Sequence, residues 1–185
     1  MNRPHAFELT IPPSSADHAI GPADAPVTVV EYGDFECPNC KQAAPAVKLL
    51  LSRFAGRIRF VYRHFPLEEV HPHALHAAEA AEGAAAQGKF WPMHDLLFDN
   101  QAHLKLHQLR SYGERLQLDL ARYAAELDDH VYLQRIREHM HSGDESGVRS
   151  TPTFFVDGGI QDVSFGLRLL FDAVEAALGT QRMHT

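Results

Sequence analysis

The sequence predicts an α/β fold, a central mixed sheet flanked by helices with an all-helical segment inserted into it. Three observations predict it. The organised part of the chain begins with a strand pattern, a helix pattern and a second strand pattern. Residues 67–147 contain no strand pattern. The last part of the chain contains two strand patterns and a helix pattern. With 185 residues, 45% hydrophobic and 22% charged, the chain has the composition of an ordinary folded protein.

The first part of the chain contains the patterns of a βαβ unit. Residues 1–26 are rich in Pro, Ser, Ala and Gly, so we expect an extended lead-in with little helix. Residues 27–32 form a β-branched run typical of a buried strand, with Glu31 as the carboxylate inside it. Residues 38–55 carry apolar side chains at helical spacing, and residues 58–65 alternate as a second strand.

The remaining elements follow from the same patterns. Residues 67–147 predict four or five short helices. Residues 153–159 form a strand pattern that ends in a Gly-Gly turn, residues 160–164 can pair with it as a hairpin, and residues 167–178 predict a closing helix. The expected domains are an N-terminal lead-in over 1–26, a sheet domain over 27–66 and 148–180, and an inserted helical subdomain over 67–147.

Charge and hydropathy argue against two classes of partner. Seventeen basic and 24 acidic side chains give a formal charge of -7, which repels nucleic acid backbones and anionic membranes. The chain contains no apolar stretch long enough to span a bilayer, and Met1–Pro13 lacks the apolar region of a secretory signal. We expect a cytoplasmic protein, or a periplasmic one if this chain is a mature form.

The two cysteines, Cys37 and Cys40, lie three positions apart, so they provide chemistry and not a disulfide framework. Pro38 places Cys37 at the start of a helix, where unpaired N–H groups and the helix dipole favour a thiolate. Such a position lowers the pKa of a thiol below its ordinary value of about 8.5. One helical turn brings Cys40 to the same face, within reach of a disulfide. The spacing predicts a redox-active pair in which Cys37 is the nucleophile and Cys40 the resolving thiol.

Glu31 lies six residues before Cys37 in an otherwise apolar strand. A buried carboxylate is costly unless it is neutral or paired. A protonated or water-linked Glu31 can exchange a proton with Cys40 as a general acid and base. The alternative is a Glu31 at the edge of the sheet with its side chain in solvent. We favour the proton relay.

Two segments resemble DsbA-like members of the thioredoxin superfamily. Residues 27–45, with Glu31, the run Asp-Phe-Glu-Cys-Pro-Asn-Cys and a helix proline, are similar to the active-site segment of that family. Residues 150–156, Ser-Thr-Pro-Thr-Phe-Phe-Val, are similar to its loop with a cis-proline, and the family also has a helical insert. The resemblance implies a thioredoxin-like fold with an inserted all-helical subdomain. It also implies thiol-disulfide oxidoreductase activity that needs no metal and no organic cofactor.

The resemblance also implies the substrate contacts. The Thr151–Pro152 bond would be cis and would lie beside the dithiol, and the backbone of Thr151 would pair with an extended substrate. Pro38 and Asn39, between the cysteines, would contact the substrate as well. An ordinary turn proline at a strand start is the alternative for Pro152. The implied partners are substrate proteins or low-molecular-weight thiols and disulfides, and a redox partner that recycles the dithiol.

The sequence departs from the best-known oxidants of the family, which have His at the position of Asn39. A cationic neighbour of Cys37 is therefore missing, and Glu36 adds a negative charge that opposes thiolate formation. We expect Cys37 to be less acidic than in strong oxidants. Together with a reducing compartment, this favours a reductase or a cytosolic redox partner over a net disulfide maker.

Three other interpretations remain open. The first is a zinc site, in which the cysteines join histidines such as His71, His73 and His76, although solvent-facing histidines are the simpler expectation there. The second is a glutathione-dependent isomerase or transferase of the same fold, a class that usually lacks an intact cysteine pair. The third is an interaction module in which residues 90–93 line an apolar groove, although core packing explains such residues more often. We expect the remaining histidines at the surface or on helix flanks, among them His64, His94, His103 and His107.

Overall fold

The computed structural model describes residues 8–164 and 166–181, and the chain divides into two compact units. We call them the sheet unit and the helical unit. The sheet unit consists of residues 8–33, 42–63 and 141–181, without residue 165. The helical unit consists of residues 34–41 and 64–140. The residues from 34 to 41, which include both cysteines, therefore belong to the helical unit.

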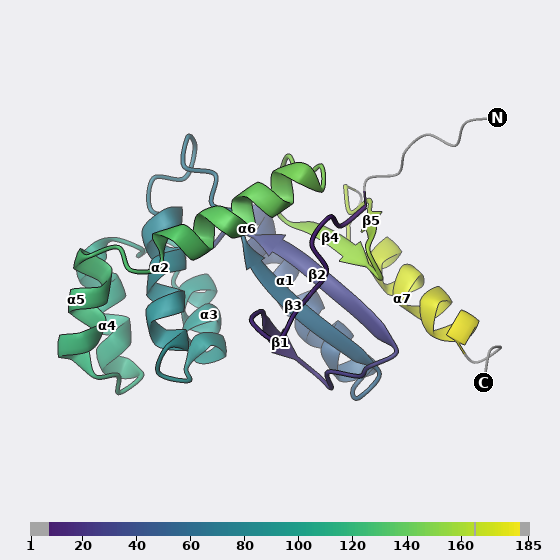
Figure 1. The fold of residues 1–185 in the computed structure, drawn as a ribbon, viewed down its shortest axis with the longest axis horizontal. Coiled ribbons are helices and arrows are strands. Elements are labelled where there is room, and N and C mark those ends of the chain that lie inside the picture. Colours follow the sequence, from purple (N-terminus) through teal and green to yellow (C-terminus); the bar gives the residue numbers. More distant parts are fainter. Residues whose placement is uncertain (1–7, 165, 182–185) are drawn as a thin grey trace. The chain divides into compact units, whose positions relative to one another are not determined.

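The sheet has five strands in the order β1-β3-β2-β4-β5 (Figure 1). Antiparallel pairs form between β1 and β3, β2 and β4, and β4 and β5. Because β2 and β3 have neighbours on both sides, six of the seven residues in each are buried, which explains their nearly continuous apolar runs. The strands are β1 (His18–Ile20), β2 (Val27–Gly33), β3 (Ile58–His64), β4 (Thr153–Val156) and β5 (Gly159–Gln161).

Helix α1 (Pro38–Arg53) connects β2 to β3, and helix α7 (Arg168–Gln181) packs on β2, β4 and β5. The buried residues Leu170, Val174 and Leu178 follow one another at intervals of four and form the apolar face of α7. Helix α7 therefore covers these three strands with its apolar face.

Five helices make up most of the helical unit, and α2 is central among them because it packs against α3, α4 and α5. Its alanines are small enough to let neighbouring helices approach closely. Gly83 of α2 and Gly113 of α4 both contact the ring of Tyr123, and a Cβ at either glycine would lie 2.8 or 2.9 Å from ring carbons. The helices are α2 (Ala74–Ala85), α3 (Phe90–Asp99), α4 (Leu106–Arg115), α5 (Leu120–Asp128) and α6 (Leu133–Glu145).

The predicted order of elements is confirmed, with differences at the ends. The lead-in contains β1, which the sequence analysis missed because three residues are too few for a recognisable pattern. The C-terminal hairpin is shorter than expected, since β4 and β5 together end at Gln161. The division into units also differs from the expected boundaries, because residues 34–41 group with the helices and residues 141–147 with the sheet.

The lead-in is held to the sheet by a buried ion pair. Arg63 binds both carboxylate oxygens of Asp17, at 2.9 and 3.1 Å, and the two side chains are 3% and 6% exposed. The guanidinium also donates to the carbonyls of Ile11 and Pro12 and to the hydroxyl of Tyr32. Burial acts to lower the pKa of Arg63, but the hydrogen bonds to Asp17 and Tyr32 outweigh it, and the pKa is raised.

We predict that Asp17→Ala lowers the free energy of unfolding by about 3–5 kcal/mol, because it leaves the Arg63 cation buried without its counter-ion. Chemical denaturation measures this change. Asp24→Ala is the matched control, since Asp24 is exposed, and it should change stability by less than about 0.5 kcal/mol. Equal effects of the two substitutions would show that the pair does not hold the lead-in.

Candidate active site

Cys37 and Cys40 lie where β2 has ended and α1 begins. Pro38 is the first residue of α1, so Cys37 directly precedes the helix, as predicted. Cys37 is 4% exposed and Cys40 is fully buried, and the two are not joined in a disulfide. The N–H of Lys41 donates to the Cys37 carbonyl at 3.2 Å, which closes the first helical turn. The turn brings both sulfurs to the region where the N–H groups of α1 are unpaired, a position that favours a thiolate.

Asp34 organises the loop before the cysteines. It is 1% exposed, and its carboxylate accepts hydrogen bonds from the N–H of Glu36 at 2.7 Å and the N–H of Leu67 at 2.9 Å. His71 Nδ1 lies 2.8 Å from the same carboxylate. The backbone of Asp34 also contacts the dithiol, because its N–H donates to Cys40 Sγ at 3.5 Å. One residue thus links Cys40 to the segment that leads into α2.

Two further side chains hold this loop. Gln101 donates through Nε2 to the carbonyls of Phe35 and Cys37, each at 2.9 Å. Glu36 Oε2 accepts the N–H of His73 at 2.6 Å, and His73 is the residue that caps α2. The negative charge of Glu36 is therefore directed at the N-terminus of α2, which stabilises a carboxylate there.

The sequence analysis missed Asp34 and Gln101, and no periodic pattern could have revealed either. For Asp34 there is one usable signal, its position three residues before the C-x-x-C pair. Asp commonly accepts hydrogen bonds from nearby backbone N–H groups, so an Asp in this loop could have been expected to organise it. Gln101 lies 64 positions from Cys37 in the chain, so only the folded structure brings the two together.

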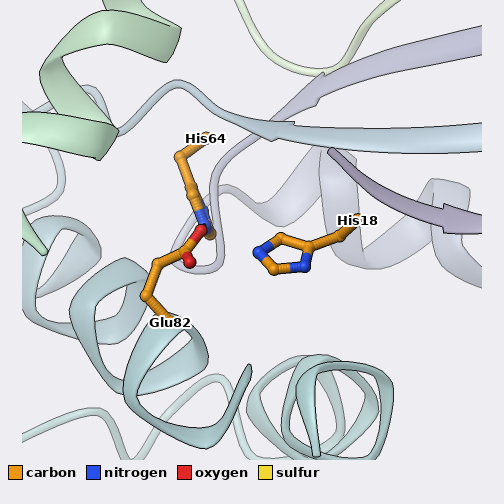
Figure 2. A group of neighbouring side chains, drawn as sticks. All are labelled: His18, His64 and Glu82. Atoms are coloured by element: carbon orange, nitrogen blue, oxygen red, sulfur yellow. The ribbon is translucent and has the colours of Figure 1, made fainter. Parts of the chain in front are cut away.

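The expectation that His64 and His94 lie at the surface is wrong. His64 is 1% exposed, and its Nε2 lies 2.9 Å from Glu82 Oε1 (Figure 2). His94 is 7% exposed, with its ring 5.6 Å from that of Phe35. Both are buried because the helical unit supplies a carboxylate for one imidazole and aromatic neighbours for the other. His103 and His107 are exposed, as predicted.

Glu31 and the loop that contains Thr151 and Pro152, which we call the proline loop, belong to the sheet unit. Glu31 is 4% exposed in β2, which has β3 and β4 as neighbours, so the alternative of a solvent-facing residue at the sheet edge is wrong. The peptide bond between Thr151 and Pro152 is cis. Glu31 is paired with Phe154, two residues after Pro152. The structure thus brings Glu31 and the proline loop to neighbouring strands, as it brings Cys37 and Cys40 to one helical turn.

The residues proposed for a zinc site are separated in the structure. Among the described residues, neither cysteine belongs to a group of three possible ligands close enough to share a metal ion. His71 contacts Asp34, and His73 uses its backbone N–H to bind Glu36. In the segment considered for an apolar groove, Phe90 and Met93 are 5% and 0% exposed and pack in the core.

Comparison with known proteins assigns the family. The family model described as Thioredoxin matches residues 14–169. The chain belongs to the thioredoxin family. It is 52% identical over 167 residues to a protein of Salinispora arenicola named Na(+)/H(+) antiporter NhaA 1, and 39% identical over 174 residues to one of Herminiimonas arsenicoxydans named Na(+)/H(+) antiporter NhaA. These matches cover 90% and 94% of this chain, which spans about a quarter of each relative, 26% and 27%.

The solved structures confirm the predicted thioredoxin-like fold with a helical insert. Oxidised BdbD from Bacillus subtilis superposes with a TM-score of 0.80 at 21% identity, over 88% of this chain and 93% of that one. A thioredoxin-like oxidoreductase from Silicibacter pomeroyi DSS-3 gives 0.74 at 26% identity, over 89% and 93%. Wolbachia pipientis alpha-DsbA1 gives 0.74 at 18% identity, over 93% and 96%. Helices in the described part of the chain are all too short or too polar to cross a membrane.

We predict that Asp34→Ala lowers the free energy of unfolding by about 2–4 kcal/mol, because two backbone N–H groups and one imidazole lose a buried acceptor. It should also speed alkylation of Cys40, because the carboxylate that fixes the loop is lost and the backbone N–H of residue 34 is no longer held against the Cys40 sulfur. Denaturation and timed thiol labelling measure the two effects. Asp99→Ala, at an exposed position of α3, is the control that should leave both unchanged. Unaltered labelling in Asp34→Ala would refute the role of Asp34 at the dithiol.

Proposed function

We propose that the chain is a thiol-disulfide oxidoreductase that exchanges disulfides with protein or small-thiol substrates through Cys37 and Cys40. The observation that carries the proposal is the placement of two cysteine thiols one helical turn apart at the start of α1. The family model and the fold support it. The antiporter names belong to proteins of which this chain matches about a quarter, so the proposal rests on the dithiol itself.

In the reducing direction, the Cys37 thiolate attacks one sulfur of a substrate disulfide. A mixed disulfide forms, and the other substrate sulfur leaves as a thiolate that takes up a proton. Cys40 then loses its proton and attacks the Cys37 sulfur, which releases the first substrate sulfur as a second thiolate. The substrate gains two electrons and the enzyme holds a Cys37–Cys40 disulfide. A dithiol partner restores the enzyme by the reverse exchange.

The environment of Cys40 supports its role as the resolving thiol. Its sulfur is fully buried and accepts the Asp34 N–H, a bond that stabilises negative charge on that sulfur during attack. A buried thiol still needs a group to accept its proton. We propose Glu31, because it is a buried carboxyl in the strand that ends four residues before Cys37.

The proposed substrate contacts combine backbone and exposed side chains. Pro38 and Asn39 are exposed between two buried cysteines, so they offer a surface to a substrate that approaches Cys37. Thr151 precedes Pro152, and we propose that its backbone pairs with an extended substrate segment. Such pairing is independent of the substrate's side chains and suits an enzyme that accepts several proteins.

We further propose that the enzyme works as a reductase in the cytoplasm. Asn39 supplies no positive charge beside Cys37, so the thiolate lacks the stabilisation that makes a strong oxidant. Glu36 is a smaller obstacle to thiolate formation than the sequence suggested, because its carboxylate binds the His73 N–H. The neutral side chain of Asn39 is the stronger of the two effects.

We predict that Cys40→Ser accumulates a covalent complex with substrate, because the mixed disulfide forms and cannot be resolved. Non-reducing electrophoresis after incubation with a disulfide-containing protein detects it. Cys37→Ala should abolish both exchange and trapping, and the double variant Cys37→Ala/Cys40→Ser is the control. Full turnover by Cys40→Ser would instead indicate a single-thiol, glutathione-dependent enzyme. Exchange that persists in Cys37→Ala would overturn the proposal.

For Glu31→Gln we predict a fall in turnover of about 10- to 100-fold with little change in stability, since Gln keeps the shape but cannot exchange the proton. The pH profile of turnover should lose the contribution of Glu31, an effect that a packing defect would not produce. Glu68→Gln, at an exposed position, is the matched control. An unchanged pH profile in Glu31→Gln would remove Glu31 from the mechanism.

A further inference from the structure

A second cluster of ionisable side chains lies in the helical unit, apart from the residues of the dithiol loop. It consists of His76 and Glu79 of α2 and His130, which lies between α5 and α6. One possible ligand atom from each residue, a ring nitrogen or a carboxylate oxygen, lies within 4.8 Å of the corresponding atoms of the other two. The proposed redox chemistry uses none of these three residues.

Two structural features bring the cluster together. His76 and Glu79 are three positions apart on α2, so their side chains project from the same face of the helix. His130 has a φ of 52°, a left-handed conformation uncommon for a residue with a side chain. Its Nδ1 lies 2.9 and 3.2 Å from the two oxygens of Glu79, and its ring centre lies 5.9 Å from that of His76.

The burial of Glu79 points to a cation. Glu79 is 1% exposed, and a carboxylate removed from water needs compensating positive charge. The His130 side chain is 50% exposed, which leaves a path from solvent to the cluster. A metal ion held by the carboxylate and two neutral imidazoles would compensate the charge without protonation of either histidine.

We propose that His76, Glu79 and His130 bind Zn²⁺, with water in the fourth position. Two imidazoles and one carboxylate are a common zinc donor set, whereas Mg²⁺ and Ca²⁺ prefer oxygen ligands alone. Zinc bonds of about 2.0–2.1 Å in a tetrahedral site set the donor atoms about 3.3 Å apart. The 2.9 and 3.2 Å between His130 Nδ1 and the Glu79 oxygens are close to this spacing, and the possible ligand atom of His76 lies within 4.8 Å of theirs.

A zinc ion at this position would cross-link two parts of the helical unit. It would tie α2, the central helix of that unit, to the segment between α5 and α6. The three ligands come together only in the folded state, so bound zinc stabilises that state and raises the temperature of unfolding. The existence of the site is independent of the proposed redox function.

Calorimetric titration of ZnCl2 into the full chain tests the proposal. The background is Cys37→Ser/Cys40→Ser, because cysteine thiolates bind zinc themselves. We expect one ion per chain, an affinity about tenfold or more weaker in both His76→Ala and His130→Ala, and an unchanged affinity in His107→Ala, which removes an exposed histidine of α4. Zinc should raise the unfolding temperature of the background and of the control more than that of His76→Ala.

His76→Ala keeps the contact between His130 and Glu79, so it removes a ligand without leaving Glu79 unpartnered. Circular dichroism verifies that each variant is folded, and Co²⁺ in place of zinc should give the visible absorption of a tetrahedral nitrogen and oxygen site. Absence of zinc binding in the background, or equal affinity with and without His76 and His130, would overturn the proposal.

Discussion

The geometry of the dithiol depends on one buried carboxylate. Asp34 accepts hydrogen bonds from the backbone of Glu36 and Leu67 and contacts His71, and its own N–H reaches Cys40 Sγ. The loop before α1 therefore has little conformational freedom, and the position of the helix start at Pro38 is fixed. The consequence is chemical, because the reaction needs two sulfurs held one turn apart, with the first at the end of the helix dipole.

Much of the fold could be predicted from the sequence. The β-branched run of β2 and the apolar spacing of α1 and α7 are strong sequence signals, because each pattern extends over several residues. The dithiol was equally visible, since the chain has two cysteines and Pro38 marks a helix start. For Glu31 the apolar neighbours favoured a buried position over a solvent-facing one, and the structure shows it buried.

The remaining features depend on contacts between distant parts of the chain. β1 is three residues long and is defined by its pairing with β3. His64 is buried because Glu82, 18 positions away, offers a carboxylate, and composition alone favours a histidine at the surface. The cluster of Glu79 with His130 is a comparable case, since 51 positions separate the two residues. Local patterns carry no information about such pairs.

The most direct test of the account is the redox equilibrium of Cys37 and Cys40, followed by thiol labelling in glutathione and dithiothreitol buffers. We predict one two-electron transition in which both thiols disappear together, with a potential at or below the cytosolic glutathione poise of about −220 to −260 mV. A clearly higher potential would contradict the reductase direction while leaving disulfide exchange in place. Thiols that stay reduced across the whole range would contradict the central claim that the pair is redox-active.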